Sequence, residues 1–171
     1  KGALTAIRQI SEMKGDVKML AMTHCDASKL AKQHGKKAEY ALCASQWHKS
    51  LSYKDNYFGG GLKYDKDFTA AYGYAPPYQA AESSAALLVY KDAFERANSF
   101  DTKKVRDALA KTNMQTFYGN VKFGSGGQNT AKPMVLFQVR CTGDKCENKV
   151  VAPTKWASAK LVHPIPSWSK R

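Results

Sequence analysis

Side chains that could bind or transform a small molecule follow two predicted strands of this chain. The apolar run Val17–Met22 predicts a buried strand, and the loop after it carries Thr23, Cys25 and Asp26. A hydroxyl, a thiol and a carboxylate in one loop could bind a polar ligand, and the carboxylate could pair with an ammonium group. Asp26 is also suited to cap the helix that follows, so both interpretations of this residue stay open.

The second predicted strand, Glu39–Cys43, is followed by Gln46 and Trp47. In an open parallel sheet, ligands bind beyond the carboxyl ends of the strands, which makes both residues candidates for ligand contact. The Trp47 ring could stack on an aromatic group or cover an aliphatic one, but it could also be a core or hinge aromatic. Tyr78, which precedes the long helix predicted from Gln79 onward, is a further candidate.

The sequence lacks the residue patterns of common catalytic sites. His24 and Cys25 are neighbours, but adjacent side chains in an extended loop diverge and do not make a nucleophile–base pair. There is no G-x-S-x-G elbow, no P-loop and no G-x-G-x-x-G after a strand, and residues 124–126 resemble a phosphate loop in composition only. We therefore predict a protein that is not an enzyme and that uses neither a cofactor nor a metal ion.

Four cysteines indicate an oxidising compartment. Cys141 and Cys146 flank a predicted Gly-Asp turn between two predicted strands, where a disulfide would close a short loop. We favour this disulfide over a zinc site, because zinc needs four ligands and no second Cys/His pair has matching spacing. Cys25 and Cys43 each lie at the end of a predicted strand and could be a second disulfide or two buried thiols.

Length and composition are those of a globular protein. The 171 residues, 43% hydrophobic and 24% charged, allow one or two compact units. The formal net charge of +13 invites comparison with nucleic-acid-binding proteins. The lysines are nevertheless interleaved with Asp and Glu along the chain, and no zinc-finger, helix-turn-helix or aromatic RNA-binding signature accompanies them. We therefore expect a solvated basic surface and no nucleic-acid partner.

Up to Cys43, the order helix, strand, loop, helix, strand is typical of a parallel α/β layer. Residues 44–61 then make a long polar and aromatic connection. Further helices are predicted over residues 63–72, 79–97 and 101–110, the last of them capped by Asp101. A strand with a Gly119-Asn120 turn is predicted over Thr116–Phe123. The longest helix has one predicted buried stripe, which consists of Leu87, Tyr90, Phe94 and Ala97.

Several short motifs, in their order and spacing, resemble one protein family. They are Ala38-Glu39-Tyr40, Tyr64…Phe68…Tyr72-Gly73, Ala93-Phe94-Glu95-Arg96-Ala97, Val105-Arg106-Asp107-Ala108-Leu109, Gly119-Asn120-Val121-Lys122-Phe123, Val150-Val151-Ala152-Pro153 and Pro166-Ser167-Trp168. The chain resembles the C-terminal half of a type I periplasmic solute-binding protein, of the branched-chain amino-acid-binding kind found in ABC transporters (extracellular ligand-binding receptors). The insert Lys49–Gly61 and the Cys141–Cys146 hairpin are not general to that family and indicate a subgroup with longer chains.

The resemblance implies an α/β fold of the type I periplasmic-binding-protein kind, with parts of two Rossmann-like lobes built on parallel sheets. The chain would be a fragment of a longer protein whose N-terminal half is missing. Residues 1–43 would begin lobe two, residues 44–133 would belong to lobe one, and residues 134–171 would return to lobe two and form the tail. The two crossings, near Cys43–Gln46 and Pro133–Val135, should therefore lie side by side.

The implied function is non-catalytic capture of a small solute between the two lobes of an ABC importer's binding component. The implied solute is an amino acid, an amide or an aromatic acid, and the implied macromolecular partner is the membrane permease. The implied location is the periplasm. The alternative is the ligand-sensing domain of a receptor or regulator.

Overall fold

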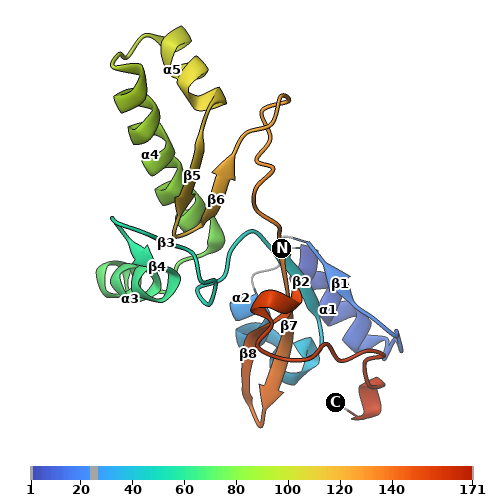
Figure 1. Cartoon of the computed structure of the whole chain (residues 1–171). Helices are drawn as coiled ribbons and strands as arrows, with labels where there is room; N and C mark the ends of the chain where they lie inside the picture. The colour runs from blue at the N-terminus through green and yellow to red at the C-terminus, as the bar shows by residue number, and fades with distance from the viewer. Residues whose placement is uncertain (1, 24–26, 171) are drawn as a thin grey trace. The chain divides into compact units, whose positions relative to one another are not determined.

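The computed structural model describes residues 2–23 and 27–170 and divides the chain into two compact units. Unit 1 comprises Lys1–Ser45 and Met134–Arg171, and unit 2 comprises Gln46–Pro133. Each unit contains helices and strands of its own (Figure 1).

Unit 1 is built on a four-stranded sheet in the order β1-β2-β7-β8. The strands are β1 (Ala21–Met22), β2 (Leu42–Ser45), β7 (Val135–Thr142) and β8 (Lys145–Ala152). The helical segments are α1 (Gly2–Glu12), α2 (Ala27–His34) and the short turns η1 (Gly35–Ala38), η2 (Thr154–Trp156) and η3 (Trp168–Lys170). Strands β1 and β2 are parallel, as expected, but β7 runs antiparallel to both β2 and β8, so the sheet is mixed.

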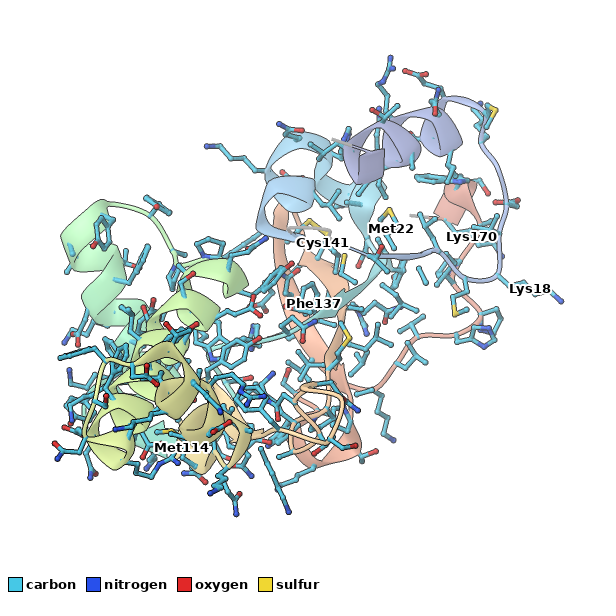
Figure 2. The ribbon with its side chains drawn as sticks, turned by 90° about the horizontal axis from the view of Figure 1, so that it is seen from above. Lys18, Met22, Met114, Phe137, Cys141 and Lys170 are labelled. Carbon is cyan, nitrogen blue, oxygen red and sulfur yellow. A yellow bond between two sulfur atoms is a disulfide. The ribbon has the colours of Figure 1, made fainter. Side chains whose placement is uncertain are left out.

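The core of unit 1 lies between the helices and this sheet. Ile7 of α1 and Leu30 of α2 are almost fully buried and pack with apolar side chains of the strands, including Cys43, Phe137 and Val139. Figure 2 shows Phe137 and Cys141 along the same strand, β7.

Two strand predictions need correction. The predicted strand Val17–Met22 shrinks to β1, because the Lys18 carbonyl accepts a hydrogen bond from the Ile165 N–H of the C-terminal tail (3.0 Å) rather than from a strand. The predicted strand Glu39–Cys43 starts later, at β2, because Tyr40 has a φ of +66°. That left-handed conformation interrupts an extended segment.

The predicted disulfide at the tip of a hairpin is confirmed. Cys141 and Cys146 lie directly opposite each other on β7 and β8 and are bonded (Figure 2). The turn between them contains Gly143 with a φ of +58°, a conformation that glycine adopts without strain. Cys25 lies outside the described residues, so its pairing with Cys43 stays a prediction.

The register of β2 and β7 brings the two crossing segments together. Ser45 pairs with Val135, and Cys43 pairs with Phe137. The chain therefore leaves unit 1 and re-enters it on neighbouring strands, which confirms the predicted adjacency of these segments.

Unit 2, all of whose residues are described, contains three helices and two two-stranded sheets. The helices are α3 (Gly61–Tyr72), α4 (Tyr78–Ala97) and α5 (Thr102–Ala110). The hairpins pair β3 (Lys54–Asp55) with β4 (Gly59–Gly60), and β5 (Asn113–Thr116) with β6 (Gly119–Lys122). The three predicted helices are confirmed, and so is one cap, because the Asp101 carboxylate accepts a hydrogen bond from the Lys104 N–H at 3.0 Å.

Two other predictions for unit 2 need correction. The turn of the β5–β6 hairpin falls at Phe117-Tyr118, not at Gly119-Asn120. Phe117 is fixed in this turn because its ring is fully buried and its backbone N–H donates a hydrogen bond to Asp55 Oδ2 (2.6 Å). Of the predicted stripe of α4, Leu87 and Tyr90 are exposed, whereas Phe94 and Ala97 are half-buried and pack against a cluster of α4 and α5. The buried residues of α4 are Ala81, Ala85, Leu88, Val89 and Ala93.

Candidate functional site

Thr23, the one candidate residue of unit 1 that the structure describes, lies where a parallel strand ends. In the register of β1 and β2, Met22 is the neighbour of Cys43, so both strands run toward the same edge of the sheet. Thr23 follows β1 directly and is exposed. Cys25 and Asp26 lie outside the described residues. The predicted position of Thr23 at the carboxyl edge of the sheet is therefore observed, while its contact with a ligand stays a prediction.

Gln46, the first residue of unit 2, is hydrogen-bonded to Lys132, which lies near the end of that unit. Its backbone carbonyl accepts a short hydrogen bond from the Lys132 ammonium group. The same ammonium group lies over the Tyr118 ring, 4.3 Å from the centroid, which is a cation–π contact. A side chain at Gly119 would collide with the stem of Lys132, so glycine is required there for the lysine to take this path.

Tyr78 lies close enough to Tyr118 to interact with it electrostatically. It is the half-buried first residue of α4, and Glu82 follows one turn later. Burial raises the pKa of the Tyr118 hydroxyl, and the charges of Glu82 and Tyr78 raise it further. Burial also lowers the pKa of Lys132 to about 8, an effect that the negative charge of Glu82 opposes. We call Gln46, Tyr78, Glu82, Tyr118 and Lys132 the Lys132 cluster.

The Lys132 cluster combines hydrogen-bond donors that could bind an anion with the carboxylate of Glu82. It offers one partly buried cation, whose described contacts are a carbonyl and a ring face, together with two phenol groups. A solute carboxylate could accept hydrogen bonds from the ammonium group and from a phenol. Among the described residues, no group of three His, Cys, Asp or Glu side chains could hold a metal ion.

Trp47 is part of the aromatic core of unit 2. It is 5% exposed, and its ring meets the rings of Tyr64 (5.9 Å between centroids) and Phe117 (6.2 Å) edge-on. Tyr64 and Phe117 are themselves stacked at 4.3 Å. This burial agrees with the alternative interpretation of Trp47 as a core aromatic, which holds the adjacent Gln46 in place.

Comparison with known proteins identifies the family. The model of a family described as periplasmic binding protein matches residues 1–145. This chain belongs to the periplasmic binding protein family. The family consists of binding proteins, so the prediction of a protein that is not an enzyme is confirmed at that level.

Solved structures of periplasmic binding proteins share the fold. A leucine binding protein from Thermotoga maritima is 23% identical, with a TM-score of 0.67, over 89% of this chain and 43% of its own. A substrate binding protein of a branched-chain amino acid transporter from Streptococcus pneumoniae, solved with isoleucine, is 16% identical over 89% of this chain and 42% of its own (TM-score 0.66). A periplasmic binding protein from Burkholderia mallei is 18% identical over 94% of this chain and 44% of its own (TM-score 0.72).

The chain therefore spans less than half the length of these periplasmic binding proteins. The type I fold that the sequence predicts is confirmed by these neighbours. Among the described residues, no helix is both long and apolar enough to cross a membrane.

Sequence reasoning missed three members of the Lys132 cluster: Glu82, Tyr118 and Lys132. The one local signal is the position of Lys132, directly before the Pro133 crossing. Nothing in the pattern of residues could pair Lys132 with Gln46, which is 86 residues away.

Proposed function

We propose that this chain is part of the solute-binding component of an ABC importer, which captures a small amino-acid-like or aromatic-acid solute between two lobes without converting it. The observation that carries the proposal is membership of the periplasmic binding protein family over residues 1–145. Similar structures include a leucine binding protein and binding proteins solved with leucine or isoleucine, and these amino acids exemplify the proposed solute class.

In this proposal, residues 1–43 and 134–171 belong to one lobe and residues 44–133 to the other. The two compact units support it, because their boundaries fall at Ser45/Gln46 and Pro133/Met134. Neighbouring crossing strands suit a hinge, since a small number of residues can then absorb the closure of the lobes around the solute.

The proposed contact residues are Thr23, Cys25 and Asp26 in one lobe and Gln46 and Tyr78 in the other. Trp47 supports Gln46 from the aromatic core. Asp26 would pair with the solute ammonium group. We further propose that the protein acts in the periplasm, that it delivers solute to a membrane permease, and that the N-terminal half of the same polypeptide completes the lobes.

Replacing Asp26 tests the proposed site, and Asp101 provides the matched control. As a helix cap, Asp26→Ala should cost about 1 kcal/mol of stability and leave affinity unchanged, as Asp101→Ala should. As the partner of a solute ammonium group, Asp26→Ala should weaken binding by about 2–5 kcal/mol. Isothermal titration calorimetry on the full-length protein measures the difference. Equal affinities in the two variants would reject Asp26 as a contact residue.

A further inference from the structure

A pocket on unit 1 brings together lysines from two separate segments of the chain. Its volume is about 420 Å³, which is within the range of pockets that hold small ligands. Lys14, which follows α1, and Lys36 and Lys37 of η1 line it, together with the hydroxyl-bearing residues Ser11 and Ser169. We call these five residues the lysine pocket.

The lysine pocket lies at the opposite edge of the sheet from the predicted solute contacts. Lys14 precedes β1 in the chain and Lys36 precedes β2, whereas Thr23 follows β1. Because β1 and β2 are parallel, the segments before them meet at one edge and the segments after them at the other. The lysine pocket is therefore separate from the site that the carboxyl ends of the strands would form.

The C-terminal turn η3 forms one wall of the lysine pocket. The backbone N–H of Trp168 donates to Asp16 Oδ1 (3.0 Å), and its indole N–H donates to the Gly15 carbonyl (2.7 Å). Figure 1 shows this turn, in red, near the end of α1. Asp16 also lines the pocket, and one of its carboxylate oxygens is used by Trp168. These hydrogen bonds fix the wall to the folded unit.

The ammonium groups of the lysine pocket are not paired with carboxylates. Four other lysines of the chain each lie within 2.8 Å of a carboxylate oxygen. In contrast, no carboxylate of the described residues lies within ion-pair distance, 4.0 Å, of Lys14, Lys36 or Lys37. Unit 1 contains 15 Lys and Arg residues but 6 Asp and Glu residues, so its positive charge is largely uncompensated. An anion from solution can supply the missing negative charge.

We propose that the lysine pocket binds a dianionic phosphate group, either inorganic phosphate or the phosphate of a small monoester. Such a group carries a charge of about −1.5 to −2 at pH 7 and has three strong acceptor oxygens. Three ammonium groups and two hydroxyls match both the charge and the oxygens. A carboxylate, with one charge and two oxygens, would leave part of this positive charge uncompensated. The site is independent of the solute that the protein captures.

The two Lys-Lys pairs of the sequence make a matched test. One is Lys36-Lys37 in the pocket, and the other is the exposed pair Lys103-Lys104 on α5. Isothermal titration calorimetry of the full-length protein with inorganic phosphate, at low ionic strength, measures the binding. Replacing Lys36 and Lys37 by methionine should weaken it at least about tenfold, because hydrogen bonds to a charged group are lost. Replacing Lys103 and Lys104 by methionine should leave it unchanged.

Absence of measurable phosphate binding, or an equal loss in the two double variants, would overturn the proposal. Capture of the protein by anionic lipid vesicles through Lys36 and Lys37, without binding of inorganic phosphate, would also overturn it, since the lysines would then form a membrane-binding surface. A second titration with phenyl phosphate distinguishes the two phosphate sources. Tighter binding of phenyl phosphate would assign a monoester, and equal affinity would assign the inorganic ion.

Chemical acetylation of lysines in the unmutated full-length protein gives a second readout that does not depend on the folding of a variant. Lys36 and Lys37 should react several-fold more slowly when inorganic phosphate is present at saturation, because the bound anion covers their ammonium groups. Lys103 and Lys104 should react at the same rate with and without phosphate. Unchanged reactivity of Lys36 and Lys37 would contradict the proposal.

Discussion

Lys132 gives the sharpest test of the electrostatics of unit 2. Its ammonium group is partly buried between the Gln46 carbonyl and the Tyr118 ring, and burial lowers its pKa to about 8. The ordinary value of 10.5 applies to the unfolded chain. Between these two values the unfolded state binds more protons than the folded state, so stability must rise with pH in that window. We expect Lys132→Met to remove this rise.

The size of the effect follows from the two pKa values. From about pH 7.5 to about pH 9.5, the full shift corresponds to roughly 2 kcal/mol of added stability. Because Lys132 is only partly buried, solvent screening reduces the expected gain to about 1 kcal/mol. The Tyr118 hydroxyl, whose pKa is raised above its ordinary value of 10, titrates above this window and does not interfere.

Urea unfolding at the two pH values measures the gain in stability. The probe is the fluorescence of Trp47, which is the one tryptophan between residues 46 and 133. Wild type should gain about 1 kcal/mol relative to Lys132→Met. Lys122→Met, at an exposed position on β6, should follow wild type. Parallel pH dependence of wild type and Lys132→Met would refute the view that Lys132 is held as a desolvated cation.

Three stability predictions test the packing of the two units. Phe117→Ala should cost about 3–5 kcal/mol, because this ring is fully buried, whereas Phe100→Ala at an 85% exposed position should cost under about 0.5 kcal/mol, both measured by urea unfolding. Replacing Cys141 and Cys146 together by serine should lower the stability of unit 1 by about 2 kcal/mol, and an unchanged unfolding midpoint would contradict this. Asp101→Ala should cost about 1 kcal/mol in the same assay, and a loss below a few tenths would show that the cap does not contribute.

The position of α4 was predicted correctly, but two of the four residues expected to be buried, Leu87 and Tyr90, are exposed. Periodicity analysis favours the large apolar side chains, and these are Leu87, Tyr90 and Phe94. The buried residues of α4 include the small Ala85 and Ala93, and Ala93 packs against Val105 and Ala108 of α5. Periodicity identifies faces that are fit for burial, but it does not say which partner covers each of them.

Strand boundaries were harder to predict than helices, because one depends on an unusual backbone conformation and another on a long-range contact. The left-handed backbone of Tyr40 shortens one strand, and the pairing of Lys18 with Ile165 replaces part of another. Neither feature has a signature in residue type, because non-glycine residues with positive φ are uncommon and a tail contact spans 147 residues of sequence. Local signals such as the Asp101 cap and the Cys141–Cys146 hairpin could be predicted, since each depends on residues only a few positions apart.

The candidate site, too, could be predicted from the sequence only in part. The position of Thr23 at a strand end followed from a rule about parallel sheets. The Lys132 cluster could not be predicted, because its members are far apart in the sequence of unit 2 and meet only in the folded chain.

Solute binding by the full-length protein tests the central claim most directly. Isothermal titration calorimetry against leucine, isoleucine, amides and aromatic carboxylates, followed by recovery and mass analysis of the bound compound, measures both capture and conversion. The account predicts that at least one of these solutes binds saturably at one site per chain, raises stability by about 2.7 kcal/mol at a hundredfold excess over Kd, and is recovered unchanged. Failure of every compound to bind, or recovery of a chemically altered product, would contradict the account.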